Sequence, residues 1–323
     1  PLPNPFVTGT QNILVTVTNP LNTNCIATTT LNFVINPLPI ANDITIIQCD
    51  SDLAPDGKTL FNLTVNNNLI SSNYINENFT YYTSLAGANS GLSTDLISND
   101  LAFENTIPSI MNIWVRVSNK NSGCFSVAKI TLKVSVTQID TTFHKNFENC
   151  DDTFPSDIDG FSAFDFHTVT TDIEAKLPSP STDYIIKYYT TEADALSETN
   201  EITNPSNFRN TIKNRQDIWV RVDSNLDNSC FGIGAYITLT VNPVPKINLN
   251  TNGDENELVC SNLPSFFVQL DAGIQDGSAT NNYGYIWSKD GNVLASETAP
   301  TLQVNAEGTY TVEVKNSYGC SRI

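Results

Sequence analysis

The segment NIWVRV, residues Asn112–Val117, returns 105 residues later as DIWVRV, residues Asp217–Val222. Weaker copies lie at Asn12–Val17 and Tyr310–Val314. Every copy alternates with period two, which is the pattern of a β-strand with one buried face. The positions that stay apolar predict the core face, and they are Ile113, Val115 and Val117, Ile218, Val220 and Val222, Ile13, Val15 and Val17, and Tyr310, Val312 and Val314.

Length and charge limit the classes of protein. The chain has 323 residues and a net charge of −18, from 34 acidic and 16 basic side chains. A repeat of about 100 residues is the size of a small domain, so we expect roughly three to four domains. The basic residues are few and scattered, so we expect neither nucleic acid nor anionic membranes as partners. No apolar run approaches the roughly 18–20 residues of a membrane span.

The seven cysteines follow the repeat. Cys25, Cys124, Cys230 and Cys320 each come after a copy of the strand, whereas Cys49, Cys150 and Cys260 come near the start of a unit. We therefore expect each unit to close its own disulfide, and the predicted pairs are Cys49 with Cys124, Cys150 with Cys230, and Cys260 with Cys320. Cys25 is then left single in a truncated unit.

Zinc binding is the alternative role for these cysteines. However, the sequence has no C-x-x-C, and the members of each predicted pair are roughly 60–80 residues apart, unlike zinc ligands. Disulfides closing such loops would each contribute about 4–5 kcal/mol and would persist only in an oxidising compartment.

Prolines mark the joints between domains. NPLP at Asn36–Pro39 and NPVP at Asn242–Pro245 each follow a strand, and proline stiffens such linkers.

In the last unit a tryptophan strand at Tyr285–Ser288, an Asp-Gly turn at Asp290-Gly291 and a Gly-x-Tyr-x-Val strand at Gly308–Val312 before a cysteine are typical of an immunoglobulin-like sandwich. We expect an all-β, elongated array of such sandwiches. Its predicted parts are the second half of a truncated domain at 1–38, repeats at 39–137 and 138–244, and a different subtype at 245–323 that stops before its last strand. Apart from one helical turn near Glu192–Leu196, nothing reads as helix.

Two acidic loops give the clearest chemical signal. Each follows the first cysteine of a repeat and combines several carboxylates with a turn glycine, as calcium loops do. The candidate ligands are Asp50, Asp52 and Asp56 in one loop, and Asp151, Asp152, Asp157 and Asp159 in the other. The spacing is not that of an EF-hand, and the alternative is that Asp and Gly only cap a turn.

Aromatic residues offer two further candidates. Tyr81-Tyr82 and Tyr188-Tyr189 could present one tyrosine each to a sugar ring, although alternation places the other in the core. Trp114 with Arg116, and Trp219 with Arg221, lie on the outward face of their strands, where we expect a cation–π pair or a contact with a neighbouring strand rather than a ligand site.

Catalysis is poorly supported. The two histidines, His144 and His167, lie in one repeat, and neither G-x-S-x-G nor H-E-x-x-H occurs. Carboxylates are plentiful enough for a glycosidase pair, but a single special cleft rarely lies in near-identical repeats. We therefore expect no enzyme.

The succession C-D, D-G, Y-Y-T, I-W-V-R-V, C and I-T-L-x-V-N-P-x-P resembles the tandem immunoglobulin-like repeats of large surface proteins in gliding Bacteroidetes, which the type IX secretion system exports. The last unit, with Gly308-Thr309-Tyr310-Thr311-Val312 and Gly319-Cys320-Ser321, is similar to the module that precedes their sorting region. The resemblance implies attachment or motility at the cell surface, and outer-membrane attachment machinery as partner through a C-terminal region. Asp140-Thr141-Thr142 resembles the short O-glycan acceptor of these bacteria, which makes Thr141 a candidate for modification.

From these observations we expect a secreted stalk and display segment of a bacterial adhesin. Calcium is the only cofactor expected, and surface glycans are possible partners. The alternative is an array of carbohydrate-binding modules attached to a secreted polysaccharide-processing protein.

Overall fold

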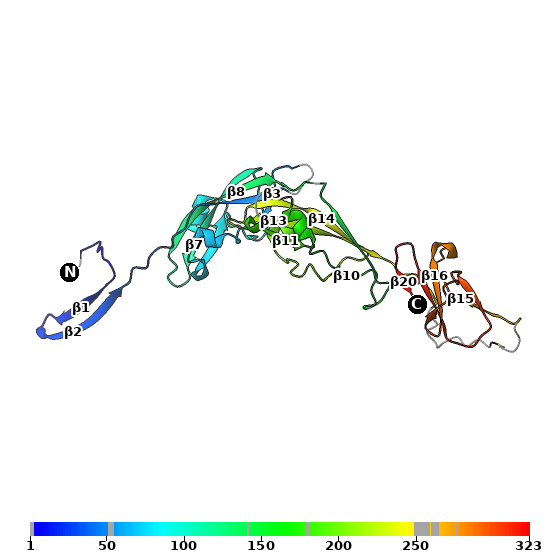
Figure 1. Ribbon diagram of the computed structural model, residues 1–323. Helices are drawn as coiled ribbons and strands as arrows, with labels where there is room; N and C mark the ends of the chain where they lie inside the picture. The colour runs from blue at the N-terminus through cyan, green and yellow to red at the C-terminus, as the bar shows by residue number, and fades with distance from the viewer. Residues whose placement is uncertain are drawn as a thin grey trace. The chain divides into compact units, whose positions relative to one another are not determined.

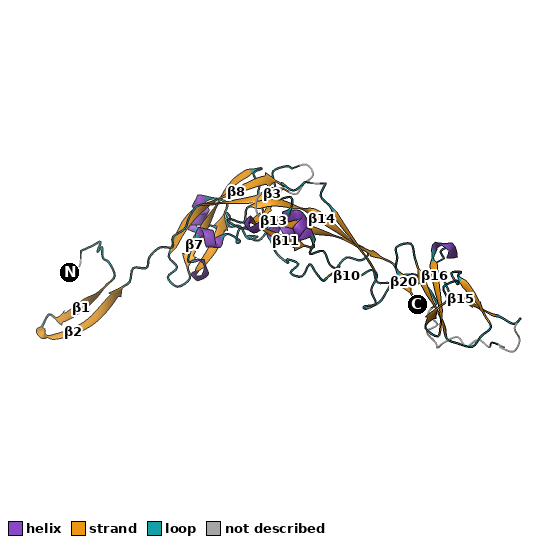
Figure 2. Ribbon diagram, viewed as in Figure 1, coloured by secondary structure: helices purple, strands orange, loops and turns teal. Residues whose placement is uncertain are grey.

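The computed structural model describes residues 3–50, 55–140, 142–178, 181–248, 259, 265–275 and 277–323. The chain divides into two compact units. The first comprises Pro1–Val136 and Leu226–Cys230, and the second comprises Thr137–Asn225 and Phe231–Ile323. Strands dominate both units, as Figure 2 shows.

The chain begins with a two-stranded hairpin, β1 (Gln11–Asn19) and β2 (Asn22–Phe33), in which Val15 faces Thr29. Its predicted core face is only partly covered, and Val17 is 64% exposed. The reason is that no second sheet packs on this hairpin among the described residues, and a lone two-stranded ribbon cannot bury a face.

The first repeat is a four-stranded sheet in the order β3-β8-β7-β5, with a small second sheet, β4-β6. Its elements are β3 (Ile44–Asp50), β4 (Leu60–Phe61), α1 (Asn67–Ile70), η1 (Tyr74–Asn76), β5 (Glu77–Tyr82), α2 (Leu85–Ser90), β6 (Phe103–Glu104), β7 (Ile110–Asn119) and β8 (Phe125–Val136). Ile113, Val115 and Val117 are fully buried, which confirms the predicted core face of β7.

One pairing within this sheet determines where the first cysteine lies. Strand β3 runs parallel to β8, from Ile44 beside Ile130 to Asp50 beside Val136. In Figure 1 the blue β3 lies next to the green β8. The first strand of the repeat therefore ends where the last strand ends, at the far end of the sheet from the tip of the β7–β8 hairpin.

The second repeat has the same topology, with the sheet order β11-β13-β14-β9 and a small sheet β10-β12. Its elements are β9 (Lys145–Cys150), β10 (Ala163–Phe164), α3 (Val169–Glu174), η2 (Ser181–Asp183), β11 (Tyr184–Tyr189), α4 (Glu192–Ser197), β12 (Phe208–Arg209), β13 (Arg215–Ser224) and β14 (Cys230–Asn242). Strand β9 again runs parallel to the last strand, and Ile218, Val220 and Val222 fill the core as predicted.

The helical turn predicted near Glu192 is present as α4, but the prediction that nothing else is helical is wrong. Helices α1, α2 and α3 also form. Local capping explains α2, because Ser84 Oγ accepts a hydrogen bond from Gly87 N and Gly91 ends the helix in the left-handed conformation. These short helices lie between strands, where the hydrophobic pattern is too brief to be read as helical.

The last domain contains a four-stranded sheet, in the order β17-β16-β19-β20, and a two-stranded sheet, β15-β18. Its elements are β15 (Val268–Asp271), η3 (Thr280–Asn282), β16 (Gly284–Lys289), β17 (Asn292–Val293), β18 (Thr301–Val304), β19 (Tyr310–Lys315) and β20 (Ser321–Arg322). Trp287 is buried in a separate core together with Tyr285 and Val314. Among all described residues, no helix is both long and apolar enough to cross a bilayer.

Candidate functional site

The disulfides are the most distinctive chemical feature of the structure. Cys49 is bonded to Cys230 with a Cα–Cα distance of 5.5 Å, and Cys150 to Cys320 with 5.6 Å. Each bond joins the end of a repeat's first strand to the hairpin of the following domain. The predicted pairs Cys49–Cys124, Cys150–Cys230 and Cys260–Cys320 are therefore wrong, and Cys260 itself lies outside the described residues.

The parallel first strand explains why a repeat cannot close on itself. Cys49 lies beside Ser135, which is about eleven residues, or roughly 36 Å, along β8 from Cys124. In the second repeat Cys150 lies beside Asn242, equally far from Cys230. A disulfide needs Cα atoms within about 7 Å, so only a hairpin supplied by another domain can reach the end of the first strand.

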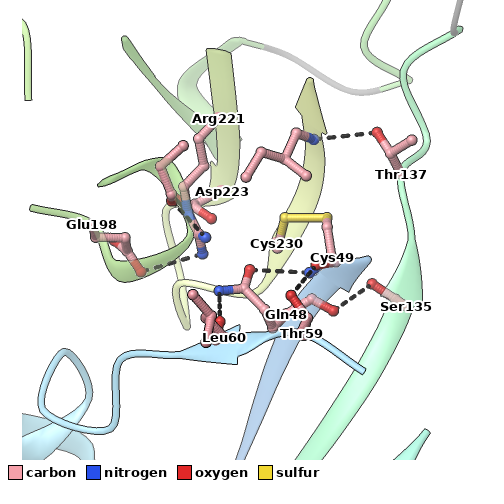
Figure 3. Close-up of a disulfide and its surroundings, with 12 residues drawn as sticks. Gln48, Cys49, Thr59, Leu60, Ser135, Thr137, Glu198, Arg221, Asp223 and Cys230 are labelled. Carbon is pink, nitrogen blue, oxygen red and sulfur yellow. Dashed lines mark hydrogen bonds and ion pairs between the residues drawn. A yellow bond between two sulfur atoms is a disulfide. The ribbon is translucent and has the colours of Figure 1, made fainter. Parts of the chain in front are cut away.

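The chain holds Cys49 rigidly at this position. Thr59 Oγ1 donates to the Cys49 carbonyl at 3.0 Å, and Gln48 Nε2 donates to the Leu60 carbonyl at 2.8 Å (Figure 3). The Gln48 side-chain oxygen accepts from the Cys49 N–H at 3.0 Å. Both sulfur-bearing residues, Cys49 and Cys230, are buried, so the bond is shielded from external thiols.

The second junction adds polar contacts to its disulfide. Arg322, two residues beyond Cys320, forms an ion pair with Asp157 in the acidic loop of the second repeat. Asn316 Nδ2 donates to the Pro243 carbonyl at 2.7 Å. Contacts on both sides of the Cys150–Cys320 bond thus join the second repeat to the last domain.

Each acidic loop contains the same hydrogen-bonded turn. Asp50 Oδ2 accepts from Gly57 N at 3.0 Å, and in the second repeat Asp151 Oδ2 accepts from Gly160 N at 2.8 Å. The Gly57 carbonyl accepts from the side chain of Asn105, as the Gly160 carbonyl does from Asn210. These two asparagines were missed in the sequence, although they are related by the same 105-residue offset.

Glycine is required at both turns. Gly57 and Gly160 have φ of 78° and 81°, in the left-handed region that favours glycine. A Cβ at Gly57 would lie 2.9 Å from the backbone nitrogen of Ser109. The aspartate and glycine therefore fix the segment after the cysteine, which is the capping role that the sequence left as the alternative to calcium.

Most of the predicted calcium ligands have other partners. Asp152 forms an ion pair with Arg209 and Asp157 pairs with Arg322, while Asp52 lies outside the described residues. Among the residues that the structure describes, no three His, Cys, Asp or Glu side chains converge as a metal cluster. In the first loop Asp56 Oδ1 accepts from Lys58 N at 2.8 Å, as a turn residue does. Calcium binding to the two acidic loops stays a prediction.

Electrostatics distinguish the carboxylates of the second loop. Burial raises the pKa of Asp151, the Gly160 N–H opposes this, and the neighbouring Asp159 raises the pKa further. Burial also raises the pKa of Asp152, but hydrogen bonds from Arg209 and from Phe154 N outweigh it and leave that pKa below its usual value. Asp151 and Asp159 are thus a repelling pair of carboxyl groups in direct contact.

The tyrosine pairs do not form a sugar platform. Tyr81, Tyr82, Tyr188 and Tyr189 are all buried, so the expectation of one exposed ring per pair is wrong. Tyr81 Oη donates to Asn67 Oδ1 at 2.5 Å, and Tyr188 Oη lies 2.6 Å from Thr170 Oγ1. These rings bury an apolar body and satisfy their hydroxyl groups internally, as core tyrosines do.

The outward face of the repeated strand is partly covered by a helix. Arg116 stacks over the Phe125 ring at 3.5 Å, and its Nη1 lies 3.5 Å from the Ala88 carbonyl of α2. Arg221 makes the matching contact, 3.1 Å to the Ala195 carbonyl of α4, but is only 2% exposed. The expected cation–π pair is therefore present in the first repeat, with Phe125 rather than Trp114 as the ring.

The second repeat surrounds its arginine with charge. Arg221 Nε lies 2.8 Å from Asp223 Oδ2, and Arg221 Nη2 lies 3.2 Å from Glu198 Oε1. Lys187 Nζ is 3.0 Å from Glu198 Oε2. Glu198 adopts a left-handed φ of 54° where the first repeat has Gly91, so this backbone strain is offset by its two cationic partners.

This charge cluster predicts a pH dependence. Burial raises the pKa of Asp223 to about 6, against the attraction of Arg221. Because the folded repeat holds this proton more tightly than the unfolded chain does, the contribution of Asp223 to stability is present below pH 4 and is lost as the pH rises through about 6. We expect Asp223→Asn to flatten the unfolding free energy of this repeat between pH 4 and 6, measured by urea titration. An unchanged slope would contradict the assignment.

Each of the two histidines forms a local hydrogen bond. His144 Nε2 lies 3.0 Å from Thr238 Oγ1, which donates to Asp217 Oδ1 at 2.5 Å. In the first repeat Thr131 Oγ1 donates to Asn112 Oδ1 at the same place in the sheet, so the pair is a cross-strand contact. His167 is exposed, and its Nδ1 lies at hydrogen-bond distance from Asp165 Oδ1 in the same loop. Asp140 accepts from Thr142, while Thr141 lies outside the described residues, so its glycosylation stays a prediction.

Two free thiols in the described part of the chain give a direct test of the pairing. Cys25 is exposed and Cys124 is half-buried, and both are free. We expect a maleimide reagent to label Cys25 and Cys124 in the native, non-reduced chain, and to leave Cys49, Cys150, Cys230 and Cys320 unlabelled, as read by peptide mass spectrometry. Protection of Cys124 together with labelling of Cys230 would contradict the structure.

The topology and the junctions define a class of protein: tandem immunoglobulin-like β-sandwich domains joined to one another by disulfides. The sequence model of one family, the Flavobacterium inter-domain disulphide bond domain, matches residues 45–138 and 146–245. These two matches cover more than half of the chain, and the chain belongs to this family. Because disulfides persist only in an oxidising environment, these bonds indicate an extracellular, non-reducing location.

Comparison with other proteins adds little to this assignment. No curated protein matches the chain. The N-terminal four immunoglobulin domains of Dscam1 isoform 8.4 superpose at 10% identity and a TM-score of 0.21, covering 90% of this chain and 74% of that one. Fibronectin(III)-like modules of CbhA from Clostridium thermocellum superpose at 12% identity and a TM-score of 0.25, covering 58% of this chain and 88% of that one. Scores this low carry no argument, and the fold is assigned from its strand topology.

Proposed function

We propose that this chain is a tension-bearing stalk segment of a secreted bacterial surface protein that serves attachment or gliding motility. The observation that carries the proposal is that each described disulfide joins one domain to the next, rather than closing a domain on itself. A pulling force therefore passes between domains through covalent bonds as well as through the single polypeptide. Such cross-links suit a segment whose work is mechanical.

Several further features support a stalk rather than an enzyme. The apparent His144–Thr238–Asp217 relay is a cross-strand contact with a counterpart in the first repeat. The tyrosines that could stack on sugars are buried. The route to the cell surface in this proposal is the type IX secretion system, with outer-membrane attachment machinery as the partner of a C-terminal region, as the resemblance to gliding-associated repeats implies.

The proposal is tested by measuring exposure of the protein at the cell surface separately from its resistance to shear. In a host strain that carries the whole gene, Cys49→Ser with Cys150→Ser removes both inter-domain bonds. We expect surface exposure, measured by antibody labelling of intact cells, to be retained, and attachment under high shear in a flow chamber to fall. Cys25→Ser is the matched control, because this thiol is free. Shear resistance equal to that of the parent strain would contradict the proposal.

Carbohydrate binding is the second candidate function. A glycan array probed with the purified chain separates the two, because a stalk segment binds none of the glycans. Reproducible binding to one glycan class, competed by the free sugar, would favour the carbohydrate-binding array instead.

A further inference from the structure

Two carboxyl groups beside the second junction have oxygen atoms without partners. Asp151 is 8% exposed, and its Oδ1 has no hydrogen-bond partner among the described residues. The same holds for Asp159 Oδ2, which is also buried. Their other oxygens are used within the loop, since Asp151 Oδ2 accepts from Gly160 N and Asp159 Oδ1 accepts from Phe161 N at 3.0 Å.

The unpartnered oxygens belong to neighbouring groups. Asp159 acts on Asp151 both through its charge and through a direct side-chain contact. A buried carboxylate oxygen without a donor is energetically unfavourable, and two such oxygens side by side repel one another. An arrangement of this kind is stable only if a positive species, either a proton or a metal cation, lies between them.

The charges around this pair favour a divalent cation. The loop contains four carboxylates, and two of them pair with guanidinium groups, Asp152 with Arg209 and Asp157 with Arg322. Arg209 Nη2 also lies 4.0 Å from Asp159 Oδ1, so Arg209 forms a second, longer ion pair with this carboxylate. Two guanidinium groups against four carboxylates leave the loop with a net charge of −2, which is the charge that one divalent cation balances.

We propose that Asp151 and Asp159 bind one calcium ion, beside the Cys150–Cys320 bond. Calcium prefers hard oxygen ligands and tolerates irregular geometry, so backbone carbonyls and water can complete a shell that two carboxylates begin. With so few charged ligands, the expected dissociation constant is on the order of 10⁻⁴–10⁻³ M, the range of extracellular modules. The ion would connect residue 151 to residue 159 and so close the loop that carries Asp157 towards Arg322.

The site is a property of the second repeat. The first repeat has Glu104 at the position of Arg209, which would add negative charge rather than pair with the loop. In the first repeat Asp56 shares one feature with Asp159: the side chain of each accepts a hydrogen bond from the backbone N–H of the residue two positions later. We therefore predict one site of this kind rather than one per repeat.

Calcium titration of the purified, oxidised chain tests the proposal. We expect isothermal titration calorimetry with calcium alone to detect binding in the stated range, and Asp159→Asn to weaken it at least tenfold. Asparagine keeps the oxygen that accepts from Phe161 N, so this variant is expected to fold. Asp165→Asn is the matched control, because it removes one exposed carboxylate from the same repeat and should leave the affinity within twofold.

A second readout is the thermal unfolding midpoint with and without calcium, monitored through Trp219 fluorescence in chains that also carry Trp114→Phe and Trp287→Phe. Calcium should raise the midpoint of the parent chain and of Asp165→Asn, but not that of Asp159→Asn. The proposal is overturned if the parent chain binds no calcium up to 10-fold above the expected range, or if Asp159→Asn binds as tightly as the parent. The first result would mean that a shared proton, not a cation, lies between the two groups.

Discussion

Stretched in single-molecule force spectroscopy, the oxidised chain should reach only about 460 Å when all domains are unfolded, against about 1,100 Å after reduction. The disulfides set this limit. The shortest covalent path runs from Pro1 to Cys49, across to Cys230, back along the chain to Cys150, and across to Cys320. This path contains about 130 residues, each spanning at most about 3.5 Å.

Single substitutions in the same experiment reveal that the two disulfide loops overlap. Without the Cys49 bond, the path through Cys150–Cys320 still limits the extension, so Cys49→Ser should gain only about 70 Å. The double variant Cys49→Ser with Cys150→Ser should reach the reduced length. If each repeat closed its own disulfide, Cys49→Ser would instead release the 49–124 loop and gain roughly 260 Å. A gain of that size would contradict the pairing.

Arg221→Met should lower the unfolding free energy of the second repeat by about 3–5 kcal/mol. The substitution keeps much of the side-chain volume but leaves Asp223, which is fully buried, and Glu198 without their guanidinium partner. Urea unfolding followed by Trp219 fluorescence measures the loss. Trp114→Phe and Trp287→Phe in the background make Trp219 the only tryptophan, so the signal comes from the repeat that carries the substitution.

Arg116→Met is the matched control, because the two arginines occupy the same position of the repeated strand. Arg116 is half-buried and stacks on Phe125, a contact that contributes about 0.5–1 kcal/mol. With Trp114 as the only tryptophan, its loss should cost about 1 kcal/mol or less. Equal costs for Arg116→Met and Arg221→Met would mean that the buried charges around Arg221 do not determine its contribution.

The sequence was sufficient for features that depend on local pattern. The alternation in NIWVRV placed Ile113, Val115 and Val117 in the core, and the repeat defined the order of strands. It could not provide the direction in which the first strand pairs with the last, because a short apolar run is the same in parallel and antiparallel pairing. The cysteine pairing failed for that reason: Cys49 lies beside Ser135 rather than beside Cys124.

Burial of the outward face was also beyond the sequence pattern. Alternation predicted correctly that Arg116 and Arg221 lie opposite the core, but the short helices that cover this face come from residues that read as irregular. The difference between the two arginines depends on Lys187, Glu198 and Asp223, which come from three separate strands or helix ends. Similarly, the sequence grouped all the acidic residues of the second loop, and only the structure showed that Asp151 and Asp159 each keep one buried oxygen atom without a hydrogen-bond partner.

Determining the disulfide connectivity is the most direct test of the claim that each repeat is bonded to the domain that follows. The native protein, alkylated without reduction and digested, should yield peptides cross-linked through Cys49 and Cys230 and through Cys150 and Cys320, identified by mass spectrometry. Cys124 should appear as an alkylated thiol. A peptide that links Cys49 to Cys124 would show that the repeats close on themselves, and the proposed transmission of force between domains would have no covalent basis.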